Sequence, residues 1–151
     1  MRVAFEKTAQ IAEMFTENYP NSYPPVIINI TDGIPTDCAV EELPEVVLPI
    51  MNIKTSDGAS LIFNIHISPD SAPSIFFPKR SDILPDVNSG HLLNASSTIP
   101  STFAAKLAEL QEQIGKKGFP IHENSKCLVY NADPSTLIEA IRIIVWGIYS
   151  I

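Results

Sequence analysis

The fold of this chain is decided by the stretch Val26-Ile27-Ile28-Asn29-Ile30-Thr31-Asp32-Gly33-Ile34-Pro35-Thr36-Asp37. Its first residues are mostly β-branched, and the run ends abruptly in Thr31-Asp32-Gly33. Such a run is typical of a strand buried in a parallel sheet, and Gly33 lets the backbone turn after it. Because open α/β sheets bind ligands at the carboxyl ends of their strands, the pattern predicts that Asp32 lies at a ligand-binding edge.

The composition is that of one globular domain spanning residues 1–151, with 45% hydrophobic and 18% charged residues. Ten basic and seventeen acidic residues give a net charge of −7, which argues against a nucleic-acid partner. No apolar run approaches the ~20 residues of a membrane-spanning helix, and the sequence does not begin with a signal-peptide pattern. Cys38 and Cys127 match no metal-binding spacing. We therefore expect reduced thiols and a cytoplasmic location without membrane contact.

Helical periodicity and turn residues divide the first third of the chain into two helices and a strand. Residues 3–18 are predicted to form a helix without a capping side chain before it. Its apolar positions define one stripe, predicted to be buried: Ala4, Ile11 and Phe15, joined by Phe5 and Ala12. The strand at residues 26–31 follows. Residues 39–54 are predicted to form a second helix that is broken near Pro49, because proline removes a backbone donor.

The alternation continues to the end of the sequence. The further predicted elements are a strand at 61–67, a short helix at 86–93 within a Pro/Ser-rich loop region at 69–100, a helix capped by Ser101 and ended by Gly115, and a strand at 126–131. Asp133 and Pro134 are a strong start signal for a last helix. Its predicted buried face contains Leu137, Ile138, Ile141, Ile144 and Val145. This order predicts an α/β fold with a parallel sheet of about three strands and right-handed crossovers.

The string from Tyr23 to Gly33, followed by Pro35-Thr36-Asp37, resembles von Willebrand factor A-type (VWA) domains, and most closely their bacterial intracellular-type members. The similarity continues in order through Thr55-Ser56-Asp57-Gly58, residues 61–68, Phe77-Pro78, Ser96-Ser97 and Asn131-Ala132-Asp133. It therefore covers nearly the whole chain. The resemblance implies a doubly wound, Rossmann-like parallel sheet.

The resemblance also implies a metal-ion-dependent adhesion site that binds a divalent cation, usually Mg²⁺. That site combines an Asp-x-Ser-x-Ser sequence after the first strand, a threonine in a later loop, and the aspartate of Thr-Asp-Gly. Only the last element is matched here, at Asp32. Met1 resembles the methionine that follows the second element in the family, so we expect the carboxyl-terminal part of a VWA domain, without its first strand.

Asp32 is therefore the candidate metal ligand, and its alternative role is to close the turn before Gly33. Because Mg²⁺ prefers a near-octahedral set of oxygen ligands, one carboxylate predicts a weak site in this chain. Asp37 can add charge, although an aspartate in such a loop is more often a turn or cap residue. His66 lies in a strand, where a hydrogen-bonded core role is more common than a catalytic or ligand role. Thr31 and Thr36 are expected to satisfy backbone groups.

These features predict a non-catalytic protein-interaction module in which Mg²⁺ assists binding once the missing amino-terminal part completes the site. By the resemblance, an acidic residue of the protein partner completes the coordination of the metal. The alternative is a small metal-dependent hydrolase or phosphate-handling enzyme that uses Asp32, Asp37 and His66. Because the neighbouring first strand is absent, residues 26–30 are predicted to form an unprotected sheet edge. Such an edge recruits the missing part or a second copy of the chain.

Overall fold

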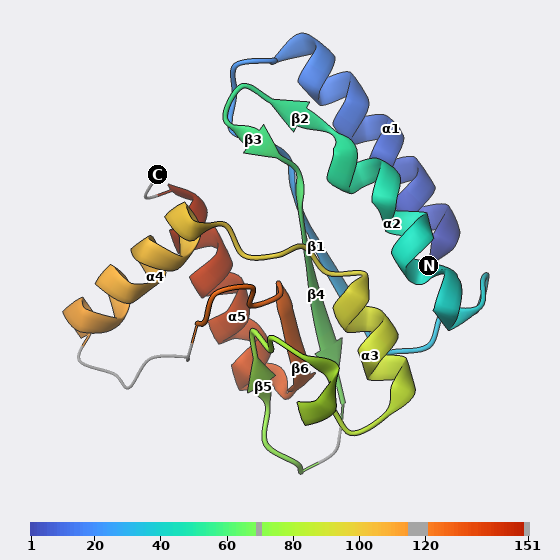
Figure 1. Cartoon of the computed structure of the whole chain (residues 1–151), viewed down its shortest axis with the longest axis vertical. Helices are drawn as coiled ribbons and strands as arrows, with labels where there is room; N and C mark the ends of the chain where they lie inside the picture. The colour runs from blue at the N-terminus through green and yellow to red at the C-terminus, as the bar shows by residue number, and fades with distance from the viewer. Residues whose placement is uncertain (69–70, 115–120, 150–151) are drawn as a thin grey trace.

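The computed structural model describes residues 1–68, 71–114 and 121–149 of the chain (Figure 1). The helices are α1 (Arg2–Asn18), α2 (Leu43–Asn52), α3 (Val87–Asn94), α4 (Ser101–Ile114) and α5 (Pro134–Tyr149), with short 3-10 turns at Val40–Glu42 and Ser81–Ile83. The strands are β1 (Val26–Thr31), β2 (Lys54–Thr55), β3 (Gly58–Ala59), β4 (Leu61–Ile67), β5 (Ile75–Phe76) and β6 (Leu128–Ala132). The predicted helices and main strands are thus present, within a few residues of the expected bounds.

A four-stranded sheet with the order β1-β4-β6-β5 forms the centre of the fold. β1, β4 and β6 run parallel, and β5 is antiparallel to β6. This arrangement confirms the predicted α/β class with a mostly parallel, Rossmann-like sheet. The sequence does not predict β5, because two residues in a proline-rich loop show no periodicity. Within the described ranges β1 pairs only with β4, so the predicted sheet edge at residues 26–30 is confirmed.

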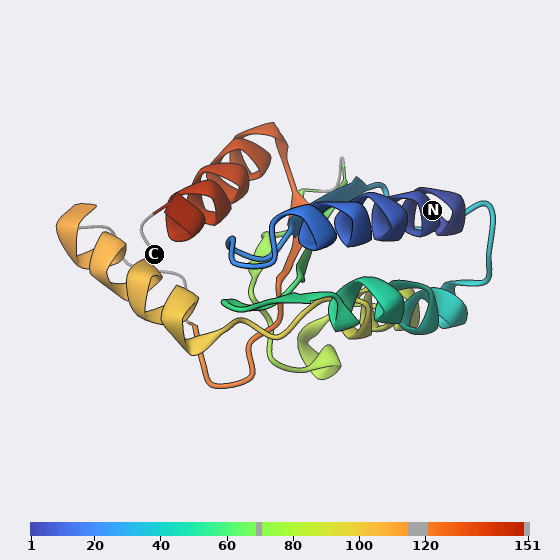
Figure 2. The ribbon, with the colours of Figure 1, turned by 90° about the horizontal axis from the view of Figure 1, so that it is seen from above.

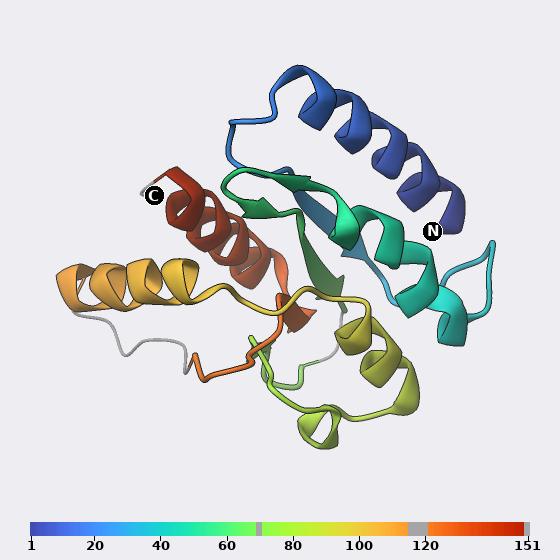
Figure 3. The same cartoon turned by 45° about the horizontal axis from the view of Figure 1, so that its top comes forward.

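Helices cover both faces of the sheet in two layers (Figures 2 and 3). The larger core cluster joins α4 and α5 to the side chains of Leu61, Phe63 and Ile65 on one face of β4. Ile62 points to the opposite face, where it packs with α1 and α2. Leu128 of β6 points to the same face of the sheet as Ile62 and packs with α3 there. The parallel strands are therefore buried from both faces, as their continuous apolar sequences require.

The apolar stripe of α1 does not face the core as predicted. Phe5 is buried in the cluster with α2 and Ala12 is buried as well, but the other members of the stripe are exposed: Ala4, Ile11 (68% exposed) and Phe15 (39% exposed). The helix carries apolar residues on two sides, and periodicity alone does not identify which side meets the core. α1 packs mainly against α2 and leaves its second apolar side uncovered.

The break that Pro49 predicts in the second helix is not present. α2 runs from Leu43 to Asn52 with Pro49 inside it, after a 3-10 turn at Val40–Glu42. Proline at this position removes one backbone donor near the end of a short helix. The three fully buried side chains Leu43, Val47 and Ile50 hold the helix against the sheet and α1. Tertiary packing therefore outweighs the local cost of the proline.

The last helix begins as predicted, because the Asp133 carboxylate accepts a hydrogen bond from the Thr136 amide at 2.7 Å. Its predicted buried face is confirmed in part: Ile144 is buried, and Leu137 and Ile141 pack against the same core cluster. Ile138 (62% exposed) and Val145 (39% exposed) face solvent instead, and Ala140 and Ile143 are buried. Ser101 is the first residue of α4 and not its cap, since the Pro100 carbonyl already accepts from Ala104. The predicted end of that helix at Gly115, and the side chains of Leu110 and Ile114, lie outside the described residues. Within the described part of the chain, no helix combines the length and apolar character needed to cross a bilayer.

Candidate functional site

The carboxyl ends of the parallel strands surround a small pocket of 170 Å³. The residues that line it come from the loop after β1 (Asp32, Gly33, Ile34), from β4 and β6 (His66, Tyr130), and from the start of α3 (Asp86, Asn88, Ser89, Leu92). Asp32 and His66 therefore meet at one site, as the position of the Thr-Asp-Gly sequence predicts for a sheet edge. At ~30 Å³ for each water molecule, the pocket holds a few waters or one partly hydrated ion.

The turn after β1 places Asp32 at the rim of this pocket. The Thr31 hydroxyl accepts a hydrogen bond from the Gly33 amide at 3.0 Å, which confirms its expected backbone role. Gly33 has φ +118°, and a Cβ atom at this position would lie 3.2 Å from Nε2 of His66. Glycine is required here both for the positive φ and for the close approach of the ring. Asp32 itself is exposed to solvent.

His66 forms the wall of the pocket and is held by two neighbours. Its ring stacks on Tyr130 with centroids 4.4 Å apart and planes 5° from parallel. Its Nδ1 accepts a hydrogen bond from the Asn131 amide at 3.3 Å. An accepting Nδ1 means that the neutral ring carries its proton on Nε2, the atom nearest Gly33. Asn131 has φ +57° and lies where the β4–β6 register shifts, so a local bulge creates this hydrogen bond.

The start of α3 contributes a second carboxylate, which the sequence does not connect with the site. Asp86 accepts a hydrogen bond from the Ser89 amide at 2.7 Å and another from the Tyr130 hydroxyl at 3.3 Å. These bonds, the Ser89 amide first, hold the pKa of Asp86 below its usual range. The Asp86-x-x-Ser89 spacing indicates a helix start in the sequence. Nothing local indicates that this helix start meets Tyr130.

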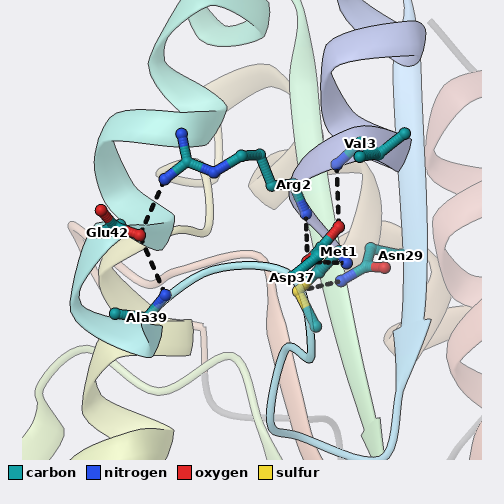
Figure 4. A network of polar contacts seen from close by, with 7 residues as sticks. All are labelled: Met1, Arg2, Val3, Asn29, Asp37, Ala39 and Glu42. Atoms are coloured by element: carbon teal, nitrogen blue, oxygen red, sulfur yellow. Dashed lines mark hydrogen bonds and ion pairs between the residues drawn. The ribbon is translucent and has the colours of Figure 1, made fainter.

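Asp37 lies outside the pocket and caps α1 instead (Figure 4). Its carboxylate accepts hydrogen bonds from the Met1 amino group, from the Arg2 amide at 2.9 Å and from the Val3 amide at 3.0 Å. The Met1 amino group, followed by the two amides, holds the pKa of Asp37 well below its usual range. The expected cap role of Asp37 is confirmed. Because Asp37 is far from the start of α1 in the sequence, no local pattern indicates that it caps this helix.

A nearby ion pair fixes the same loop to α1. The Arg2 guanidinium and Glu42 lie 2.8 Å apart, and Glu42 also accepts from the Ala39 amide at 3.0 Å (Figure 4). The Ala39 amide, followed by Arg2, lowers the pKa of Glu42. The loop between β1 and α2 is thus tied to α1 at Asp37 and Glu42, which limits the positions that Asp32 can take.

The electrostatics of the pocket favour cations. Two carboxylates, Asp32 and Asp86, line it, and its lining contains neither lysine nor arginine. Such a surface repels phosphate and attracts metal ions. The described residues nevertheless contain no group of three or more histidine, cysteine, aspartate or glutamate side chains that could hold a metal. Asp32 alone does not provide the oxygen ligands that a tight Mg²⁺ site needs.

The remaining histidines and cysteines lie away from this pocket. His91 and His122 line two other hollows, of 420 and 750 Å³ respectively. Cys127 is fully buried in the core, and burial raises the pKa of its thiol. Cys38 is half-buried, and both cysteines are free. These positions offer no nucleophile beside Asp32 and His66.

Comparison with protein-family models, with curated proteins and with solved structures finds no significant match to this chain.

Proposed function

We propose that this chain is a non-catalytic protein-interaction module of the VWA type, whose contact surface is the edge of the sheet around Asp32. In this proposal Asp32 supplies one oxygen ligand to Mg²⁺. The other ligands come from a protein partner and from a polypeptide that completes the site. The isolated chain accordingly binds the ion weakly.

One observation carries the proposal: an exposed carboxylate stands at the carboxyl end of a parallel strand, on a turn that only glycine permits. The positive φ of Gly33 and its approach to His66 hold Asp32 outward, where a partner can reach it. The pocket lining beside it carries two carboxylates without a basic residue, which suits a cation. An exposed aspartate held by the backbone is the kind of group that a metal-bridged contact uses.

The alternative, a small metal-dependent hydrolase or phosphate-handling enzyme, receives less support from the geometry. It requires Asp32, Asp37 and His66 to act together, but Asp37 is hydrogen-bonded to the start of α1. The absence of basic residues from the pocket lining also disfavours a phosphate substrate. Turnover of a generic ester or phosphate ester that Asp32→Ala abolishes would favour this alternative.

Manganese is the probe of choice for the proposed metal contact, because its paramagnetism locates a weak site. Titrating Mn²⁺ into the isotope-labelled chain is expected to broaden the amide signals of Gly33, His66 and Ser89 first. Asp32→Asn should remove this selective broadening. The matched control is Asp57→Asn, which changes another exposed aspartate in the β2–β3 turn. That control should leave the broadening unchanged.

Calorimetry with Mg²⁺ gives the second readout. We expect no site tighter than on the order of millimolar, since sparse oxygen ligation binds Mg²⁺ weakly. A stoichiometric micromolar site that is lost in Asp32→Ala would show that the described residues ligate the ion far better than their geometry indicates. Selective broadening that persists in the Asp32→Asn variant would show that Asp32 is not a ligand of the ion.

A further inference from the structure

We propose that the open edge formed by α1, β1 and α5 is an interface for a second copy of this chain, which pairs its own β1 with this one. We call this surface the β1 edge; it consists of β1 and the outward sides of α1 and α5. Figures 2 and 3 show β1 between these two helices. The inference involves no metal at Asp32, but a polypeptide that completed the site by pairing with β1 would compete with the second copy for this edge.

Among the described residues, no strand pairs with the outward backbone groups of β1. The Pro25 carbonyl accepts from the Leu61 amide at 3.0 Å, so Pro25 faces β4. Because successive residues of a strand alternate in direction, Ile27 and Asn29 also face β4, whereas Val26, Ile28 and Ile30 direct their N–H and C=O groups outward. β1 contains no lysine and no proline, the usual protections of an edge. An extended backbone is therefore the occupant that this edge fits.

The second element of the edge is the uncovered side of α1. Ile11 is 68% and Met14 is 63% exposed, and Val3 and Phe15 lie on the same side of the helix. On the buried side of α1 lie Ala12 and Phe5, of which Phe5 belongs to the cluster with α2. α1 packs mainly on α2 and not on the strands. An apolar side of this size on a surface helix indicates a missing contact.

The third element is α5, on the opposite face of the sheet. It carries two exposed apolar side chains, Ile138 at 62% and Val145 at 39%. Ile30 of β1 is 46% exposed. Its side chain points to the α5 face, because Val26 and Ile28 pack into the α4–α5 cluster. Across the described residues, seven of the thirteen exposed large apolar side chains lie on α1, β1 and α5.

A second copy has the chemistry that the β1 edge requires. The occupant must be a strand with apolar side chains on both faces, because a helix with an uncovered apolar side flanks each face of the sheet. β1 is such a strand, with the sequence Val-Ile-Ile-Asn-Ile-Thr. Antiparallel pairing of two β1 strands about a two-fold axis places α1 beside its own copy on one face and α5 beside its own copy on the other. Each uncovered side then meets an apolar partner.

The number of residues in these three elements is comparable with that of a standard interface. α1, β1 and α5 contain 17, 6 and 16 residues. A standard interface uses about 20–30 residues and buries about 800 Å² on each partner. The outward halves of the two helices together with β1 reach the lower end of that range.

The test is the molar mass of the purified chain by light scattering over a concentration series. The wild type is expected to be a dimer at tens of micromolar. Ile30→Pro removes one outward N–H without touching the β1–β4 ladder, and should weaken dimerisation at least about tenfold. Ile30→Val keeps that N–H and should remain dimeric. Ile11→Lys places a charge on the uncovered side of α1 and should also give monomers, whereas Leu48→Lys, at an exposed apolar position of α2 (53% exposed), should not.

Each other outcome would overturn the proposal. A wild type that stays monomeric and unfolds cooperatively would show that the edge needs no partner. Aggregates that all lysine variants disperse equally, Leu48→Lys included, would indicate general hydrophobic association. A stable one-to-one complex with a different polypeptide at the β1 edge, in place of the dimer, would assign the surface to that partner. Far-UV circular dichroism of every variant separates loss of pairing from loss of folding.

Discussion

Replacing Gly33 by valine tests the physical reason for the turn that presents Asp32. Gly33 has φ +118°, and a Cβ added there would meet the His66 ring, so two separate penalties are expected. Gly58 is the matched control, because it has φ +144° and an added Cβ there meets nothing within 4 Å. Both substitutions force a β-branched residue into a backbone region that it avoids. Only Gly33→Val also pushes on a neighbour.

The magnitudes follow from these two penalties. Backbone strain of this kind costs about 1–3 kcal/mol, which is the whole effect expected for Gly58→Val. At Gly33 the added Cβ would be 3.2 Å from Nε2 of His66, closer than ordinary van der Waals contact. Displacing the stacked ring adds roughly 1 kcal/mol or more of overpacking cost. Gly33→Val is therefore expected to lower the free energy of unfolding more than Gly58→Val.

Urea unfolding followed by circular dichroism measures both variants under one set of conditions. Repeating Gly33→Val in a His66→Ala background removes the atoms that the new Cβ meets and leaves the strain in place. The difference between the two backgrounds is then the contact alone. Unchanged stability of Gly33→Val would mean that the turn does not need glycine. If Gly33→Val lowers the free energy of unfolding equally in both backgrounds, the His66 ring makes no unfavourable contact with the added Cβ.

Two further predictions concern other parts of the fold. The Gly147→Ala variant in α5 should be less stable than the Gly90→Ala variant in α3. The Cβ added at position 147 overlaps the buried Phe103 ring, which costs about 1–3 kcal/mol. The Cβ added at position 90 meets Ser81 at an ordinary 3.5 Å. Both changes share the helical gain of about 1 kcal/mol, so equal urea midpoints would contradict the overlap. The ionised Asp37 carboxylate, whose pKa is lowered first by the Met1 amino group and then by two amides, stabilises the fold at neutral pH. That stability is lost as the pH falls below about 4, because the carboxylate then becomes protonated. The free energy of unfolding of Asp37→Asn should therefore decline less steeply with falling pH than that of the wild type. Parallel plots of unfolding free energy against pH for the two proteins would refute the capping role.

The helices and main strands could be predicted from the sequence because each has a strong local signal. The Asp133–Pro134 start of α5 is such a signal, and the structure places it where it was expected. The face that each helix buries could not be predicted so well. α1 has apolar residues on two sides, and only the position of α2 decides that Phe5 is buried and Ile11 is exposed. β5 is two residues long and exists because β6 offers it an edge.

The candidate site divides in the same way. Asp32 and Gly33 follow from the strand and turn pattern, and the proximity of His66 follows from parallel pairing, in which Thr31 is opposite His66. Asp86 and Tyr130 could not be predicted, because their hydrogen bond joins segments 44 residues apart. Asp37 was a candidate for the metal site in the sequence, yet the amide groups of α1 provide it with partners. Hydrogen-bond donors that are distant in the sequence therefore determine which carboxylates remain available to bind a ligand.

The loop that follows β1 connects the two proposed surfaces physically. It begins at the Thr31–Gly33 hydrogen bond beside the pocket, and it reaches the start of α1 through Asp37. α1 in turn forms one side of the β1 edge. A strand that paired with β1 as proposed would lie next to the helix to which the loop is tied, and that loop carries Asp32. Asp32 faces solvent and Asp37 faces α1, so substitutions at these two aspartates distinguish the two proposed surfaces. Substitutions at Asp32 are expected to alter cation binding, and substitutions at Asp37 are expected to weaken the anchoring of α1.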